Sequence, residues 1–331
     1  KKILKYELIL SGEKPLQNIK SVIEYVKTNF DWNNEIRKYT TKSAKQFYAQ
    51  KSGNMAEVNL FLCGMLNAAG YDAVPLLIST RSHGKVNRNY PFTHFFNGVV
   101  IMVNFEGKSF LTDGTNSLIA FNRIPSYCIN DFGLIVNKEK EGWVNLTNKS
   151  HSVSNTSFIV NIDTAEMLAK TILTIAATEM EAFQYKNRFG NEEEAFEKYL
   201  LKKGFADVEH VKIRNYDRPD KPFLLAAQVI SELEVIGDRI VLTPFFNLNM
   251  QTNLLKQDER NYPIDFTYSN TEKFTARINI PEGYKASEMP EKLIIDDELV
   301  TVNLTYAADG RQVTITGEHT FKRAVYQSDK Y

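Results

Sequence analysis

The side chains that could act as nucleophile or base gather in the first half of the chain. Its two cysteines are Cys63 and Cys128, and two of its five histidines, His83 and His94, lie between them. A cysteine attacks an acyl carbon as a thiolate, so it needs a neighbouring base and a third group that orients this base. Cys63 with His94 or His83 is one arrangement that could cleave an amide bond.

The segment that carries Cys63 has the pattern of a buried helix. Asn54 and Glu57 form a capping box at the start of a helix over about 54–69, and Gly70 supplies the residue that ends it. The helix is apolar on almost every face, which is typical of a buried helix. Cys63 lies two turns from the N-terminal dipole that would activate it, so a buried structural thiol is the favoured interpretation.

Three further positions share a layout around this helix. Met55 opens the helix, Gly98 begins an apolar strand, and Asp113 ends the strand after it. The alternation of apolar residues and a central Glu-Gly pair predict a hairpin of strands over 99–105 and 109–113. A helix start is therefore followed along the chain by a hairpin, with Gly98 at the start of its first strand and Asp113 at the end of its second.

This order resembles the transglutaminase-like superfamily, a papain-related fold. Its members place a cysteine at the start of a central helix, a histidine on the first hairpin strand and an aspartate on the second. The resemblance covers about residues 15–140 and implies that Met55 stands at the nucleophile position and Gly98 at the histidine position. Asp113 alone keeps the family residue. A thioether has no proton to lose, so the resemblance implies that this chain is not a working cysteine enzyme.

The other candidate residues border the cleft that the resemblance implies, and they are Asn54, Arg81, His83, His94 and Asn97. Arg81 and His83 lie on or beside a polar loop and could bind a carboxylate ligand, although most loop charges are only solvated. His94 precedes Gly98 by four residues, roughly 13 Å along a strand, so it replaces the lost histidine only if the chain folds back.

For each of these candidates a structural role competes with a functional one. Packing is the favoured role of Met55, and capping of a turn is the favoured role of Asp113. His94 is interpreted as a loop histidine among aromatic neighbours. The cleft that the resemblance implies between Met55, Gly98 and Asp113 could still bind a ligand, although no catalysis is expected there.

The sequence offers no pattern for a metal or a cofactor. It has no CxxC pair, no Cys/His cluster, no Gly-rich phosphate loop and no HExxH helix. Lys and Arg number 40, as do Asp and Glu, so net charge gives no case for nucleic acid or an anionic membrane. No segment approaches the roughly 18 consecutive apolar residues that a membrane span requires.

The length of 331 residues predicts two or three domains, in an α+β fold class. The transglutaminase-like (papain-like) domain is expected over 1–145. The region 146–255 mixes strands with helices at 179–188 and 192–203, and it is either its own domain or an extension of the sheet that follows. Residues 256–331 alternate apolar and polar side chains, which predicts a mostly antiparallel β module, one sheet of a β-sandwich.

This C-terminal module resembles one that follows the same domain in bacterial cell-envelope proteins. That arrangement usually includes an upstream β domain and a signal peptide, so a leader or a whole upstream domain is expected to have been removed ahead of Lys1. By this resemblance we also expect a periplasmic or cell-surface location. The partner would be a peptide, a glycan or a protein.

Three functions stay open at this point. The first is a catalytically inactive module that serves as a binding or structural element, with a peptide or glycan in its cleft. The second is an active cysteine amidase or peptidase with a rearranged centre built on Cys63. The third is a spacer that binds protein partners, whose cleft is filled by side chains such as Met55 and Phe95.

Overall fold

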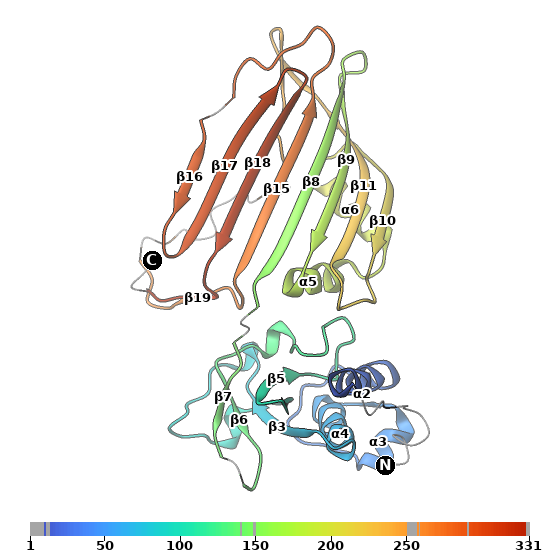
Figure 1. The fold of residues 1–331 in the computed structure, drawn as a ribbon, viewed down its shortest axis with the longest axis vertical. Helices are drawn as coiled ribbons and strands as arrows, with labels where there is room; N and C mark the ends of the chain where they lie inside the picture. Colours follow the sequence, from blue (N-terminus) through green and yellow to red (C-terminus); the bar gives the residue numbers. More distant parts are fainter. Residues whose placement is uncertain are drawn as a thin grey trace. The chain divides into compact units, whose positions relative to one another are not determined.

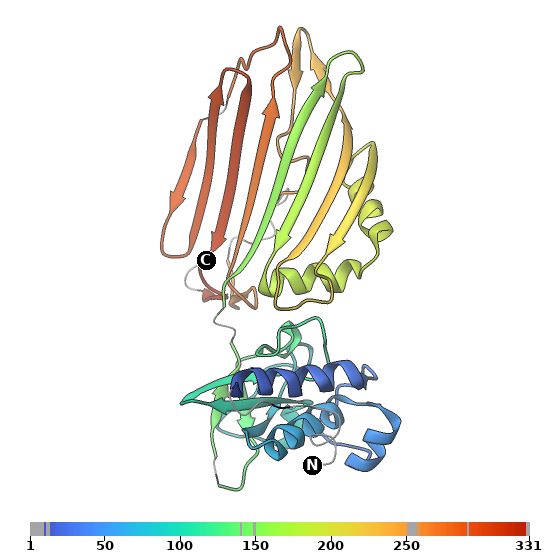
Figure 2. The same ribbon diagram turned by 45° about the vertical axis from the view of Figure 1, so that its right-hand side comes forward.

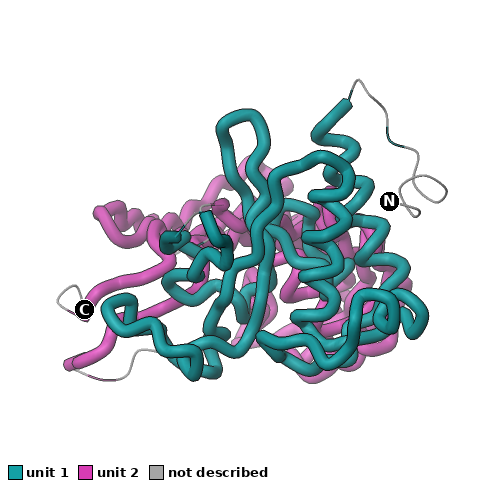
Figure 3. Tube along the Cα trace, turned by 90° about the horizontal axis from the view of Figure 1, so that it is seen from below, with its two compact units in different colours: residues 1–148 teal, residues 149–331 magenta. Residues whose placement is uncertain are grey.

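The protein divides into two compact units, residues 1–148 and 149–331 (Figure 3). The computed structural model describes residues 10, 14–139, 141–147, 150–249, 257, 259–289 and 291–328. Within this part of the chain, no helix is both long enough and apolar enough to cross a membrane.

The described residues of the first unit form three helices, drawn in Figure 1, and three short 3₁₀ turns. The helices are α2 (Pro15–Asn29), α3 (Ala44–Gln50) and α4 (Met55–Ala68), and the 3₁₀ turns are η1 (Arg81–His83), η2 (Thr93–Phe95) and η3 (Ser126–Cys128). Helix α4 confirms the helix predicted over 54–69, and Gly70 after it has the left-handed φ of 91° that ends helices. Its side chains are mostly buried, although Leu60 is 37% exposed.

A five-stranded antiparallel sheet completes this unit, in the order β5-β4-β3-β6-β7. Its strands are β3 (Asp72–Ile78), β4 (Gly98–Phe105), β5 (Lys108–Thr112), β6 (Phe132–Ile135) and β7 (Trp143–Asn145), and a parallel pair of two-residue strands, β1 (Asp31–Trp32) and β2 (Ser52–Gly53), lies apart from them. The predicted hairpin is confirmed as β4–β5, joined by Glu106 and Gly107 with φ of 49° and 74°. Apolar residues of α2, α4 and β4 form the core between helices and sheet.

The second unit contains one eight-stranded sheet, in the order β10-β11-β9-β8-β15-β18-β17-β16. Its strands are β8 (Ser152–Asp163), β9 (Leu168–Ala177), β10 (Asp207–Arg214), β11 (Phe223–Glu232), β15 (Asn270–Asn279), β16 (Leu293–Asp296), β17 (Val300–Asp309) and β18 (Gln312–Phe321). Two small ribbons pair β12 (Glu234–Ile236) with β13 (Arg239–Val241), and β14 (Ile264–Asp265) with β19 (Val325–Tyr326).

Two helices, α5 (Glu179–Phe189) and α6 (Glu193–Lys202), cover one face of the β8–β11 half of this sheet (Figures 1 and 2). They lie within about a residue or two of the predicted helices. Their aromatic side chains meet the inward face of the strands, and Tyr185 of α5 stacks on Phe223 with ring centroids 5.7 Å apart. Phe245 extends this core across the sheet, against Phe158 and Phe274.

The expected β-sandwich at the C-terminus needs correction, whereas the mostly antiparallel β region is confirmed. Among the described residues the strands form one sheet, because β8 pairs in parallel with β15 along its length, from Ser152 with Asn270 to Asn161 with Asn279. The sheet thus runs from the 146–255 region into 256–331. Period-two alternation shows that one face of a strand is buried, but it does not show whether helices or a second sheet bury it.

Candidate functional site

The structure brings Met55 and Gly98 into contact. Met55 is the first residue of α4 and its side chain is 0% exposed. Gly98 opens β4, and a Cβ placed on it would lie 2.8 Å from the Met55 sulfur and 3.3 Å from Ile78. That separation is shorter than side-chain contacts allow, so any larger residue at position 98 would have to displace the thioether. The thioether therefore occupies the space beside the strand start.

Asp113 is buried beneath this contact and is held by local donors. It is 1% exposed, and it accepts hydrogen bonds from the Thr115 backbone N–H and hydroxyl. Asn59, one turn along α4 from Met55, donates to Asp113 at 3.4 Å and to the Val99 carbonyl at 2.8 Å. Burial raises the pKa of Asp113 above its ordinary value, while Thr115 and the nearby Lys27 oppose the rise.

Lys27 is a buried cation whose charge acts on Asp113. Its ammonium donates to the Ile119 carbonyl at 2.7 Å, and burial lowers its pKa to about 8 although Asp113 favours the charged form. Asp113 thus has the partners of a structural carboxylate, namely a turn, an amide and a buried cation. It is not aimed at a histidine, because the histidine position is Gly98.

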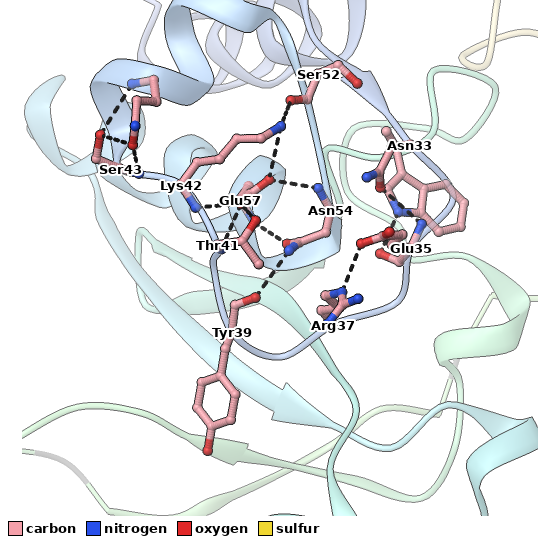
Figure 4. A network of polar contacts seen from close by, with 12 residues as sticks. Asn33, Glu35, Arg37, Tyr39, Thr41, Lys42, Ser43, Ser52, Asn54 and Glu57 are labelled. Atoms are coloured by element: carbon pink, nitrogen blue, oxygen red, sulfur yellow. Dashed lines mark hydrogen bonds and ion pairs between the residues drawn. The ribbon is translucent and has the colours of Figure 1, made fainter.

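The N-terminus of α4 is closed by a network around Glu57 (Figure 4). The Glu57 carboxylate accepts from the Thr41 N–H and hydroxyl, each at 2.8 Å, and from the Lys42 N–H at 2.9 Å. It also accepts from the Asn54 N–H at 2.9 Å, while the Asn54 amide oxygen accepts from the Glu57 N–H at 3.0 Å. This is the capping box expected from the sequence. Burial raises the pKa of Glu57, but these donors outweigh it and the net shift is downward.

The segment before the network covers the start of the helix. The Met55 N–H donates to the Glu35 carbonyl at 3.0 Å. Lys38 donates to the Thr93 and Phe96 carbonyls, which ties this segment to the chain that leads into β4. The Met55 N–H at the start of α4, like those of Asn54 and Glu57, therefore already has an acceptor within the protein.

Comparisons with known proteins agree with this geometry. Residues 3–108 match the model of the transglutaminase-like superfamily, a range that contains Met55 and Gly98 and ends before Asp113. The first unit is a transglutaminase-like domain. Residues 238–331 match DUF3858, a domain of unknown function for which a structure has been solved.

A solved structure shows the same fold. The crystal structure of a "putative protease" from Parabacteroides distasonis ATCC 8503 has a TM-score of 0.52 and 12% sequence identity, over 96% of this chain. The chain spans 48% of the length of that protein. At this identity the likeness concerns the fold alone. No curated protein matches the chain.

Neither thiol of the transglutaminase-like domain has the surroundings of a nucleophile. Cys63 is 7% exposed, contacts the Ala73 carbonyl at 3.3 Å, and has its pKa raised to about 11 by burial. Cys128 is 0% exposed, and burial together with the charge of Asp113 raises its pKa well above the ordinary value. Both are free cysteines. At neutral pH both thiols stay protonated.

The loop candidates of the transglutaminase-like domain bond to one another and to backbone. The exposed His83 ring contacts the His94 carbonyl at 2.9 Å, and the His94 ring lies 4.3 Å from Phe95. Arg81 donates to the Ile129 carbonyl, and Asn97 exchanges hydrogen bonds with Thr80. Among the described residues, no hydrogen bond joins either histidine to a cysteine, and no group of three or more His, Cys, Asp or Glu side chains is placed to hold a metal ion.

Four contributors were missed in the sequence analysis. Thr41 and Lys42 reach Glu57 from a segment with no regular structure, so no periodicity pointed to them. Asn59 is an amide between the apolar residues Val58 and Leu60 of α4, and this setting was a usable signal for a buried hydrogen-bonding role. Lys27 follows Val26 on the inward stripe of α2, which was a weaker signal of the same kind.

Proposed function

We propose that this chain is a catalytically inactive transglutaminase-like module that serves as a structural and protein-binding element of a bacterial cell envelope. The observation that carries the proposal is the contact of Met55 with Gly98. The nucleophile and base positions of the family lie side by side, as catalysis would require, yet one holds a thioether and the other has no side chain. Neither can take or give a proton at neutral pH.

The closed state of the old cleft favours a structural role over a ligand in that cleft. Met55 is 0% and Asp113 1% exposed, and the segment with Glu35 and Lys38 bonds across the helix start. A peptide or glycan would have to displace these contacts to reach the family position. We therefore propose that partners bind to the outer surface of the module and that the filled cleft is part of its core.

The envelope location is proposed from the resemblance of residues 256–331 to a module of such proteins, and cell fractionation with an antibody against the chain tests it. Recovery in the periplasmic or surface fraction is the expected result. Recovery with cytoplasmic markers would overturn the location and leave the inactivity proposal standing, because the latter depends only on Met55 and Gly98.

The inactivity proposal is tested by thiol labelling of the folded protein with an alkylating reagent across a pH series, followed by mapping of the modified peptides. We expect Cys63 and Cys128 to label only after unfolding, because burial raises the pKa of both. The Cys128→Ala and Cys63→Ala variants are matched controls in which each remaining thiol reports alone. Rapid labelling of Cys63 near neutral pH would revive the rearranged-centre alternative.

An activity assay completes this test. The purified chain is incubated with glutamine-containing peptides and an amine donor, and both hydrolysis and cross-linking are followed. No turnover above a heat-denatured sample is expected. Turnover that Cys63→Ala abolishes would show that the domain is an enzyme with Cys63 as its nucleophile, and it would overturn the proposal.

A further inference from the structure

The two edges of the eight-stranded sheet differ in how they are protected. Edge strand β10 carries a bulge between Glu209 and Lys212, has His210 at a φ of 54°, and is covered by α6. These are ordinary devices against strand addition. Edge strand β16 presents Leu293, Ile294 and Ile295, which are 46%, 66% and 42% exposed.

The apolar residues of β16 continue the pattern of the sheet. Leu293 pairs with Leu304 and Ile295 with Val302, so Leu293 and Ile295 lie on the face that carries the core. Ile294 lies on the opposite face. An added strand would have to present apolar residues on both faces. This is the pattern of β16 itself.

We propose that β16 pairs with β16 of a second copy of this chain, antiparallel, with Ile294 opposite Ile294 across a two-fold axis. Residues that lie opposite each other on paired strands point to the same face of the sheet. The two copies therefore join into a sheet with a continuous core face only if residues of the core face of one copy, such as Leu293 and Ile295, lie opposite residues of that same face in the other. In this register Leu293 faces Ile295, and Lys292 faces Asp296, twice by symmetry.

Several registers would place the core faces of the two copies on the same side of the joint sheet, and charge complementarity selects this one among them. A shift by one pair in one direction places Lys292 opposite Ile294, and in the other direction places Leu293 opposite Asp297. Either shift sets a charge against an aliphatic side chain. Only the register centred on Ile294 pairs aliphatic with aliphatic and lysine with aspartate.

The carboxylates next to the edge are arranged in a way that suits this pairing. Asp296 is oriented by the Lys322 ammonium at 2.6 Å and by the Thr301 hydroxyl at 2.9 Å. Asp297 lies beyond the strand, where its carboxylate accepts the Leu299 and Val300 N–H groups, each at 2.7 Å. Asp297 is thus held in its own turn, and Asp296 stands at the position that meets Lys292 of the second copy.

Sedimentation velocity of the whole chain over a concentration series tests the pairing. We expect a monomer–dimer equilibrium that Ile294→Lys weakens by about tenfold or more, because it sets two ammonium groups face to face. Ile236→Lys is the matched control, since Ile236 is 59% exposed on the β12–β13 ribbon and lies outside the edge. A chain that stays monomeric at all concentrations, or a dimer that survives Ile294→Lys, overturns the proposal.

A charge exchange tests the register itself. Lys292→Asp and Asp296→Lys are each expected to be monomeric, because each places like charges opposite one another. Mixed together, the two variants should form a heterodimer, since every contact is then between lysine and aspartate. Far-UV circular dichroism of each variant confirms its fold. Folded variants that fail to associate on mixing would overturn this register even if the wild-type chain dimerises.

Discussion

Glutamates of the two units that are at least partly buried have opposite pKa shifts. Glu57 in the first unit is 3% exposed and its pKa lies below the ordinary value. Glu181 and Glu272 in the second unit are only part-buried, yet the pKa of each lies above it. Burial acts upward on all three carboxyls. The sign of the shift is decided by what donates to them.

The donors differ in number and in kind. Glu57 receives three backbone N–H groups and a hydroxyl, with Lys42 Nζ at 3.8 Å. Glu181 receives the Tyr268 hydroxyl at 3.0 Å and a longer bond from Asn270.

Glu272 faces His319 on the neighbouring strand at 3.9 Å. The pKa of His319 is lowered by burial, and its Nε2 has no hydrogen-bond partner in the described part of the chain. Besides burial, which is the largest cause, Glu272 in turn raises the pKa of Glu181 and Tyr185 on α5, of Tyr199 on α6, and of Tyr268.

This contrast indicates that the Glu57 carboxylate stabilises the fold, whereas ionised Glu181 and Glu272 destabilise it. Backbone N–H groups have no other partner at a helix start, so Glu57 and its donors satisfy each other. The charge of Glu272 adds to the rise in the pKa of Glu181, and His319 opposes this rise only as the smallest cause, whereas burial alone raises the pKa of Glu272. Loss of the Glu57 carboxylate should therefore destabilise the protein. Neutralisation of Glu181 or Glu272 should stabilise it.

Glu57→Ala is expected to have the largest effect. The Thr41, Lys42 and Asn54 N–H groups would lose their acceptor in a buried site, at a cost of about 3 kcal/mol in the free energy of unfolding. Both tryptophans, Trp32 and Trp143, lie in the first unit, so urea denaturation followed by tryptophan fluorescence reports on this unit.

Glu24→Ala is the matched control for this prediction. Glu24 lies on the surface of α2, 46% exposed in its side chain, with Lys20 as its partner at 3.5 Å. Its removal should change the free energy of unfolding by about 0.5 kcal/mol or less. Equal losses for the two variants would contradict the view that the donors around Glu57 matter more than its charge alone.

Asn54→Ala is expected to cost less, about 1 kcal/mol, in the same fluorescence-detected unfolding. The variant removes the acceptor for the Glu57 N–H and the donor to the Tyr39 carbonyl, but it keeps the Glu57 carboxylate and its four hydrogen bonds. A loss as large as that of Glu57→Ala would mean that the cap, rather than the carboxylate, orders the segment before α4.

The parts of this network differ in how far they could be predicted. Asn54 and Glu57 stand three apart before an apolar run, and local pattern alone predicted their pairing. Thr41 reaches the same carboxylate across sixteen positions through an irregular segment, which leaves no period to detect. The capping box of Asn54 and Glu57 could therefore be predicted from the sequence. The donors from the segment before α4 that keep the Glu57 carboxylate charged could not.

The same limit applies to the site and to the sheet. The positions of Met55 and Gly98 followed from the order of helix and hairpin, and their direct contact is a tertiary fact. The alternation of residues 270–279 predicted a strand, but its parallel partner β8 lies more than a hundred positions earlier. Strand pairing over such separations depends on how helices α5 and α6 cover the sheet, which periodicity does not encode.

Glu272→Gln is predicted to raise stability by about 0.5 kcal/mol at pH 7, because it removes a charge that burial disfavours. The folded-state pKa of Glu272 lies above its ordinary 4.5, so the folded state binds this proton more tightly than the unfolded state. The wild-type chain should therefore regain stability relative to the variant as pH falls from neutral to 4.5. Calorimetric unfolding of both proteins across this range measures the difference, and a constant difference would contradict the assignment.

Lys42→Met is predicted to have a similarly small effect, and it tests directly whether backbone donors or the lysine keep Glu57 charged. Methionine keeps the apolar stem, while the ammonium, 3.8 Å from Glu57 and bonded to the Ser52 carbonyl at 2.7 Å, is lost. If backbone donors keep Glu57 charged, the cost should be about 0.5 kcal/mol. The stabilisation from ionised Glu57, present above pH 4.5 and lost as pH falls below it, should persist in this variant. A loss near that of Glu57→Ala, or the disappearance of this acid dependence, would show that the lysine rather than the helix start holds the charge.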